Sequence, residues 1–166
     1  MPYAVTHILT ALVSGEFIRD YVYKDGIKRY HVLIAGIAGL LPDLDFALFW
    51  ILRLIFHSTV NLNRIHRVYT HTFMIPLFLI ILALLIKKWR LVLCAIAFGF
   101  MVHLVLDGIL AGYIYPLYPF NSVGIGLNLV GRNTDLMVQI FASIDSVLLV
   151  LWLLHEEWKH KISSYF

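Results

Sequence analysis

The feature that most constrains this chain is a series of apolar stretches separated by short polar connections. The stretches cover residues 4–18, 31–41, 46–56, 71–86, 91–115 and 136–154. A helix that spans a bilayer needs about 20 mostly apolar residues. Over the 166 residues, 61% are hydrophobic and 14% are charged, whereas soluble domains carry about 25% charged residues. A soluble chain of this length could not bury so much apolar surface, so we expect an integral membrane protein.

The predicted fold is all-α. It is one membrane-embedded helical domain over residues 1–166, a polytopic bundle with about four transmembrane helices plus an interfacial or re-entrant helix. Stretch 46–56 is short for a span and follows Pro42, which breaks a helix except at its first positions. We assign it to the interfacial or re-entrant helix. Stretches 4–18 and 71–86 are also short and are expected to tilt within a compact bundle.

Basic residues are divided unequally between the connections expected on one side of the membrane and those expected on the other. With residues 19–30, the 87–90 hairpin and the C-terminal end on the cytoplasmic side, that side carries nine basic residues and the other side four. The nine are Arg19, Lys24, Lys28, Arg29, Lys87, Lys88, Arg90, Lys159 and Lys161, and the four are Arg53, Arg64, Arg67 and Arg132. The positive-inside rule favours this orientation.

This orientation brings seven candidate metal ligands toward the extracytoplasmic face. They are His7, Asp43, Asp45, His66, His71, His103 and Asp107. His103 and Asp107 are four residues apart and share one helical face, so they can bind one ion together. Imidazoles and carboxylates suit zinc first, with manganese or iron as alternatives. Seven candidates exceed the ligands of one tetrahedral site, so we expect one or two divalent ions.

Each of these residues also has a simpler interpretation. A lone histidine in an apolar stretch is usually a hydrogen-bonded core group, and Asp43 also suits a helix N-terminus. An aspartate at mid-bilayer costs roughly 2.5–3.5 kcal/mol on insertion scales, so Asp107 one turn from His103 favours a site. Arg67 either clamps a phosphate or anchors at the headgroups. Asp145 is a further ligand, an outer partner of a histidine or a helix-packing group. Interfacial positions at stretch ends are assigned to His31, His57, His155 and His160.

Five short motifs occur in a fixed order over about residues 1–120. They are Thr6-His7, Leu41-Pro42-Asp43-Leu44-Asp45, His66-Arg67-x-x-Thr70-His71, His103-x-x-x-Asp107 and Tyr118-Pro119-Phe120. Together they resemble the YdjM-like family of prokaryotic inner-membrane proteins, which are described as membrane-bound metal-dependent hydrolases. The pattern is also distantly similar to zinc-dependent phospholipase C. The resemblance implies a location in a prokaryotic cytoplasmic membrane and a metal set of His7, Asp43, His66, His71, His103 and Asp107.

The expected function is hydrolysis of a lipid-like substrate, first of all a phosphoester. Water activated by the metal would be the nucleophile, Asp45 or a spare histidine the general base, and Arg67 the clamp on the phosphate. Amide hydrolysis of a lipid is a variant. A metal transporter or sensor is the first alternative, although carriers usually bind near the midplane. The second is a bundle in which the polar residues serve only helix packing.

The remaining features concern partners. The formal charge of +3 is spread through connections without a basic stripe, so no nucleic-acid partner is expected. The expected partners are membrane lipids and the lipid-like substrate, and no oligomeric state is predicted. The single cysteine, Cys94, excludes an intramolecular disulfide and a CxxC metal motif.

Overall fold

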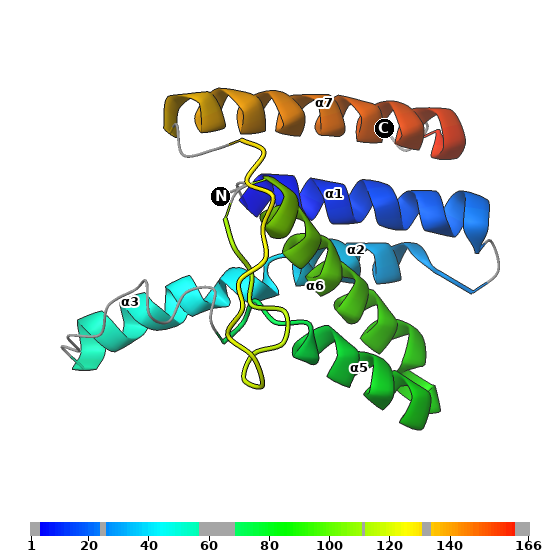
Figure 1. The fold of residues 1–166 in the computed structure, drawn as a ribbon. Coiled ribbons are helices and arrows are strands. Elements are labelled where there is room, and N and C mark those ends of the chain that lie inside the picture. Colours follow the sequence, from blue (N-terminus) through cyan, green and yellow to red (C-terminus); the bar gives the residue numbers. More distant parts are fainter. Residues whose placement is uncertain (1–3, 24–25, 57–68, 111, 131–133, 162–166) are drawn as a thin grey trace.

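The computed structural model describes residues 4–23, 26–56, 69–110, 112–130 and 134–161, which form a bundle of helices (Figure 1). In chain order these are α1 (Ala4–Phe17), the π-helix η1 (Ile18–Val22), α2 (Arg29–Ala38), the 3-10 helix η2 (Leu41–Asp43), α3 (Leu44–Phe56), α5 (Met74–Leu85), the 3-10 helix η3 (Lys87–Trp89), α6 (Arg90–Leu110) and α7 (Thr134–His160). Among the described residues the only β pairing is an isolated antiparallel bridge between Ile114 and Ile125. The predicted all-α fold is confirmed.

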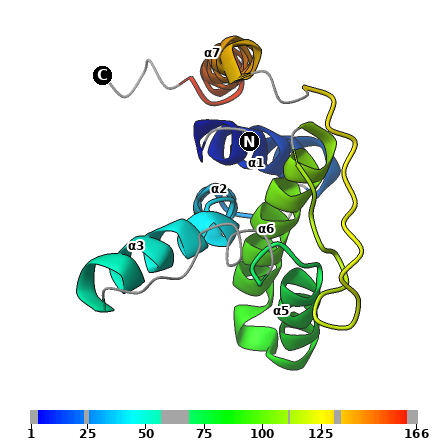
Figure 2. The same ribbon diagram turned by 60° about the vertical axis from the view of Figure 1, so that its left-hand side comes forward.

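Helix α6 crosses the bundle and packs against α2 and α5, while α1 lies between α2 and the outermost helix, α7 (Figures 1 and 2). Helix α3 leaves the bundle where α2 ends and contacts other helices chiefly through η2. The turn at residues 39–43 separates α2 from α3, with Pro42 at the start of η2. The predicted interruption at Pro42 is therefore confirmed.

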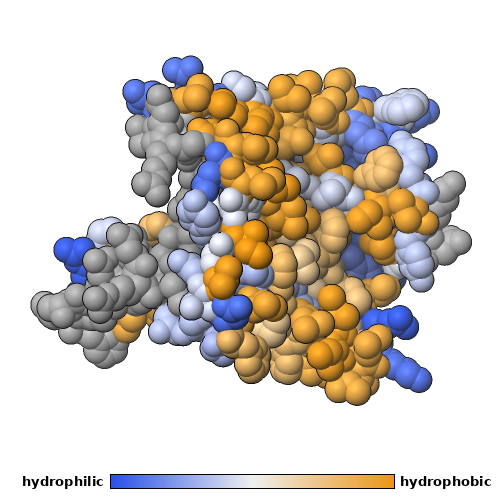
Figure 3. Space-filling view, in the orientation of Figure 1, coloured by the Kyte–Doolittle hydropathy of each residue, from blue (hydrophilic) through white to orange (hydrophobic). Residues whose placement is uncertain are grey.

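Three helical stretches are long and apolar enough to cross a bilayer. They are Arg29–Ile55, which combines α2, η2 and most of α3, Lys87–Leu110, which combines η3 and α6, and Val138–His160 within α7. Helix α5, with 12 residues, is a shorter apolar helix. Figure 3 shows a broad apolar belt over the middle of the molecule, with polar side chains gathered mostly toward its two ends. Such a surface is stable against lipid and unfavourable in water. The chain is a membrane protein with three helical stretches of spanning length and one shorter helix, where the sequence predicts about four spans.

Helices α2 and α6 approach closely because small residues line their contact. A Cβ atom on Gly99 would lie 2.0 Å from the carbonyl oxygen of Ala35 and 3.0 Å from the Cβ of Ala38. Small residues let helix backbones approach in membranes, where association depends on packing. The contact brings the end of α2 against the second half of α6, and Gly39 thereby reaches His103.

The connection from α6 to α7 folds back over the end of α6. Ile114 and Ile125 exchange two backbone hydrogen bonds of 3.0 and 2.9 Å. The hydroxyl of Thr72, which precedes α5, lies 3.0 Å from the carbonyl oxygen of Pro116 and 2.9 Å from that of Tyr118. These bonds satisfy backbone groups that lipid could not satisfy. They also fix the residues before α5, including His71, against the end of α6.

Candidate metal centre

Five of the predicted ligands converge at the end of the bundle where α1 begins and α6 ends. His7 lies on α1, Asp43 in η2, His71 just before α5, and His103 and Asp107 on α6. His7, His71, His103 and Asp107 are completely buried, and the side chain of Asp43 is 22% exposed. The predicted ligand His66 and the predicted clamp Arg67 lie outside the described residues.

Four possible ligand atoms, from η2, the segment before α5, and α6, lie close together. The Nε2 atoms of His71 and His103 are 3.2 Å apart. Asp43 Oδ1 lies 3.8 and 3.7 Å from these two nitrogens, and Asp107 Oδ2 lies 3.4 and 3.9 Å from them. Ligand atoms bound tetrahedrally at about 2.0–2.1 Å from one zinc ion are about 3.3 Å from each other. The atoms of Asp43, His71 and His103 form one group of about this size, and Asp107 Oδ2 lies beside both imidazoles; these four residues are called the cage below.

Hydrogen bonds outside the cage determine which imidazole nitrogens carry a proton. His103 Nδ1 lies 2.7 Å from the carbonyl oxygen of Gly39, which can only accept, so Nδ1 is the protonated nitrogen. Thr70 donates its hydroxyl hydrogen to Asp45 Oδ2 at 2.9 Å and therefore accepts from His71 Nδ1, also at 2.9 Å. In the neutral rings both Nε2 atoms then present lone pairs to the two carboxylates. Four electron-rich atoms facing one another are the arrangement that a cation stabilises.

His7 extends the site on the far side of Asp107. Its Nε2 atom lies 3.6 Å from Asp107 Oδ1, and its ring stacks on that of His103 with centroids 3.7 Å apart. The donor atoms of His7, His103 and Asp107 form a second possible ligand group, which shares His103 with the first. Because one Nε2 atom binds one ion, these described residues offer one full set of ligands and part of a second around Asp107.

Asp45, the predicted general base, is buried but lies outside the cage. Its Oδ2 atom is 3.9 Å from His71 Nδ1, the nitrogen that points away from His103 and Asp107. The hydroxyl of Thr70 bridges the two groups. A carboxylate in this place orients the imidazole and raises its basicity. The geometry thus supports a positioning role for Asp45, and its action as a base stays a prediction.

Sequence reasoning missed two of the groups that support the cage. The carbonyl of Gly39 has no signature because every residue carries one, and only the close contact of α2 with α6 gives it a role. Thr70 is part of the His-Arg-x-x-Thr-His motif, but from the sequence alone we expect it only to cap a helix. In the structure its hydroxyl links Asp45 to His71. Asp145, which the sequence left open, is in none of the ligand groups of the described residues.

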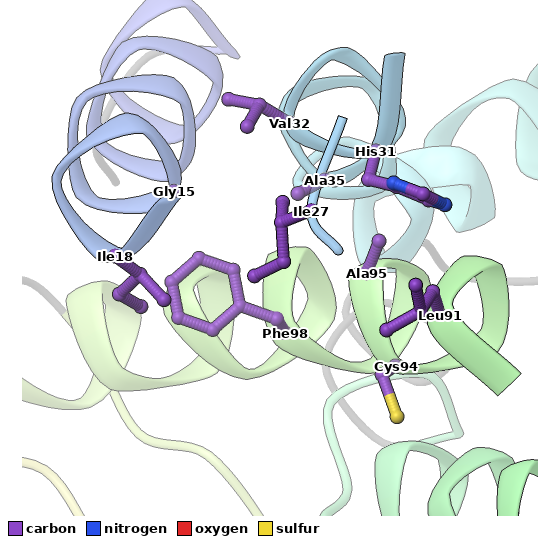
Figure 4. A pocket seen from close by; sticks show the side chains of 10 residues that line it. All are labelled: Gly15, Ile18, Ile27, His31, Val32, Ala35, Leu91, Cys94, Ala95 and Phe98. Carbon is purple, nitrogen blue, oxygen red and sulfur yellow. The ribbon is translucent and has the colours of Figure 1, made fainter. Parts of the chain in front are cut away.

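Two apolar cavities lie beside the helices, and neither contains a cage residue. The first, of about 280 Å3, lies between α1, α2 and the first half of α6, away from the cage (Figure 4). His31 lines it and accepts a hydrogen bond from the backbone of Lys28 at 2.9 Å, so His31 serves the start of α2. The second, of about 540 Å3, lies between α1, α6 and α7. Its lining residues Thr10 and Leu106 are within one helical turn of His7 and Asp107.

Comparison with known proteins gives one match. The sequence model of a protein family described as YdjM inner membrane protein matches residues 1–163. No curated protein and no solved structure matches the chain.

Proposed function

The chain belongs to the YdjM family of inner membrane proteins, and we propose that it is a metal-dependent hydrolase of a lipid-like substrate. The cage would hold one or two divalent ions, zinc first and manganese or iron as alternatives. The observation that carries the proposal is the convergence of the Nε2 atoms of His71 and His103 with the carboxylates of Asp43 and Asp107. The favoured substrate class is a phosphoester, with a lipid amide as the variant.

The residues of the cage suit this chemistry. A divalent ion bound there would polarise a phosphoryl oxygen and make water a competent nucleophile at neutral pH. Gly39 and Thr70 fix the imidazoles in one tautomer, so no reorganisation is needed when substrate arrives. The fully buried His71, His103 and Asp107 act in a water-poor environment, where electrostatic effects are strong. Asp43 is the partly exposed member of the cage.

The membrane setting supports a lipid-like substrate. The cavity of about 540 Å3 between α1, α6 and α7 is lined mainly by apolar side chains, among them Val102 and Leu148. It begins within one helical turn of His7 and Asp107, so a chain lying in it would have its polar end near the cage. Exposed apolar residues over the outside of the bundle keep the site at the level of the bilayer.

The position of the cage also bears on the alternative of a metal transporter. Carriers usually hold their cargo near the bilayer midplane, between repeated halves. Here His7 is in the first turn of α1 and Asp107 in the last turn of α6. A site at helix ends is suited to chemistry at one face. Zinc or manganese flux into proteoliposomes, abolished by His103→Ala, would favour the transporter instead.

The first experiment measures bound metal by mass spectrometry on protein purified in detergent. The double variant His103→Ala with Asp107→Ala is expected to lose the ion of the cage, whereas wild type retains it. His31→Ala is the matched control, because His31 is also a buried histidine but serves the start of α2. No difference in metal content between wild type and the double variant would overturn the proposal at its first step.

The second experiment offers phospholipids and isoprenoid phosphates to the zinc-loaded and manganese-loaded protein in mixed micelles. Release of phosphate or headgroup is expected, falling by about 100-fold or more in Asp107→Ala. A protein that binds its ions but cleaves neither class of phosphoester nor a lipid amide would retain the metal centre and lose the hydrolase assignment.

A further inference from the structure

A second group of polar side chains lies at the opposite end of the bundle from the cage. Its members come from the end of α1 with η1 and from the last turns of α7: Glu16, Arg19, Asp20, His155, Glu156 and His160. Glu16 is nine residues beyond His7 on one helix, which is about 14 Å along its axis. The sequence predicts interfacial positions for His155 and His160, and the proposed hydrolase uses none of the six residues.

Three members of this group are buried and charged. Glu16 and Arg19 are each 6% exposed and Glu156 is 7% exposed. Arg19 lies 3.1 Å from Glu16 Oε1 and 2.8 Å from Asp20 Oδ1, and 4.0 Å from Glu156 Oε1. One guanidinium therefore faces three carboxylates. The other nearby cations, Lys28, Arg29 and Lys159, are exposed on the wall of an adjoining pocket.

The charges of the group do not balance without a further cation. Three carboxylates against one guanidinium leave a formal charge of minus two when the imidazoles are neutral. Burying uncompensated charge is costly, and exposed lysines compensate little because water screens them. Protonated imidazoles, a divalent cation, or a proton on Glu16, whose pKa burial raises to about 8, would reduce this deficit.

The distances around His155 favour the divalent cation, whereas His160 is within hydrogen-bond distance of Asp20 Oδ2, at 3.2 Å. A protonated imidazole paired with a carboxylate would form hydrogen bonds of about 2.7–2.9 Å. His155 instead lies 3.5 Å from Glu16 Oε2 through Nδ1 and 3.5 Å from Asp20 Oδ2 through Nε2. Glu16 Oε2 and Glu156 Oε1 are buried. His155 lies 3.5 Å from the first atom, and His160 and Arg19 lie 3.7 and 4.0 Å from the second. Separations of this size are typical of ligand atoms that share an ion.

The space beside these atoms also suits an ion. One ligand atom from each of Glu16, His155 and Glu156 lies within 4.8 Å of the other two. A cavity of about 100 Å3, lined by Glu16, His155 and Trp152 among others, adjoins them. One imidazole and two carboxylates are ligands that zinc and manganese both accept.

We propose that Glu16, His155 and Glu156 form a second divalent-cation site, separate from the cage, which joins the end of α7 to α1. The site links α1 and α7, which lie side by side (Figures 1 and 2). An ion bound only by the folded protein stabilises it in proportion to its affinity. Its role is therefore structural: it holds the outermost helix in place. This inference does not depend on the proposed hydrolase activity.

The test measures metal per chain in a background that lacks the cage, His103→Ala with Asp107→Ala. After zinc or manganese is offered and excess is removed, one ion per chain is expected to remain. Adding Glu156→Gln is expected to remove it. Glu157→Gln is the matched control, because Glu157 is the exposed glutamate next along the same helix. Retention of the ion in the Glu156→Gln variant would overturn the second site.

Wild-type protein provides a second measurement that does not need the double variant to fold. Zinc is expected to raise the midpoint of thermal unfolding of wild type more than that of Glu156→Gln, and the metal content of this variant should fall by one ion. Equal zinc-induced shifts and equal metal contents would overturn the second site and show that protons, not an ion, balance the charge. Loss of all metal from the cage variant would also contradict the second site, whereas loss of lipid hydrolysis alone would not affect it.

Discussion

At the scale of single residues, the cage depends on two groups outside it, each of which holds one of its imidazole rings. The carbonyl oxygen of Gly39 accepts a hydrogen bond from Nδ1 of His103, and the hydroxyl oxygen of Thr70 accepts one from Nδ1 of His71. If either imidazole changed tautomer, an N–H group would point into the cage and repel a cation. Removing such outer partners typically costs 10- to 100-fold in metal affinity. Substitutions of Thr70 and Asp45 can therefore test the effect of the outer hydrogen bonds on zinc affinity without removing a proposed ligand.

Thr70→Val removes the hydroxyl between Asp45 and His71 while nearly preserving side-chain volume. We expect the affinity for zinc, measured by competition with a chelator, to fall by about 10- to 100-fold. Ser146→Ala is the control, because the Ser146 hydroxyl bonds only within α7, to the carbonyl of Ala142. A zinc affinity within about twofold of wild type in Thr70→Val would contradict the proposed tautomer of His71.

Asp45→Asn distinguishes a positioning role from the role of general base. If Asp45 acts through Thr70 and His71, its effect on zinc affinity and that of Thr70→Val will not add in the double variant. The expected loss in the double variant is close to that of the larger single loss. An unchanged zinc affinity in Asp45→Asn, combined with a large fall in kcat, would support the predicted base instead.

The residues that meet in the cage could be predicted from sequence, and the groups that support them could not. The i, i+4 spacing of His103 and Asp107 predicts a shared helical face, and both residues lie in the cage. His7, Asp43 and His71 were placed at the same end by counting helix crossings. No sequence pattern identifies the carbonyl of Gly39, because its role arises from the distance between two helices.

At the scale of elements, the contact of α2 with α6 determines the shape of the cage. Asp43 follows α2 and His103 lies on α6, so their separation is set where Ala35 meets Gly99. A Cβ at Gly99 has no room, because the neighbouring atom is the backbone oxygen of Ala35. The two helices would have to separate to accept any side chain there.

Gly99→Ala is therefore expected to destabilise the protein by about 1–3 kcal/mol, the usual range for an overpacked core. It should also lower the content of cage metal by moving Gly39 away from His103. Thermal unfolding in detergent and metal analysis check both effects. Gly108→Ala is the control on the same helix, because its Cβ would meet only the side chain of Ile114 at 3.4 Å. Equal stability in the two variants would contradict the close contact.

The ends of the elements were the least predictable part of the fold. The apolar stretch 91–115 suggested a longer helix than α6, which ends at Leu110 before Gly112 takes a φ of +117°. Helix α7 continues to His160, beyond the apolar stretch 136–154, because its last turns carry the charged residues that meet Glu16 and Arg19. The hydropathy of a segment indicates which residues lie in lipid, but it does not indicate the residue at which the helical backbone hydrogen bonds end.

At the scale of the whole molecule, the helix ends sort into two faces. The beginnings of α1, α5 and α7 and the end of α6 lie at the face of the cage (Figure 1). The hairpin at Lys87–Trp89 and the end of α7 lie at the other, where most basic residues are found. The positive-inside rule then predicts that the cage faces the extracytoplasmic side.

Cysteine labelling tests this orientation in a Cys94→Ser background. A membrane-impermeant maleimide is expected to label Asn121→Cys, in the connection before α7, in intact spheroplasts. Lys88→Cys, in the hairpin between α5 and α6, should react only after the membrane is permeabilised. The Cys94→Ser parent controls for background reaction. The reverse pattern would place the cage on the cytoplasmic side.

The order of the ligands along the chain has a consequence for biosynthesis. Every cage residue that the structure describes lies between His7 and Asp107, whereas α7 begins only at Thr134. Chains fold from the N-terminal part first during synthesis. The ribosome therefore releases a complete cage before the last helix enters the membrane. The residues of the cage can therefore come together before α7 docks.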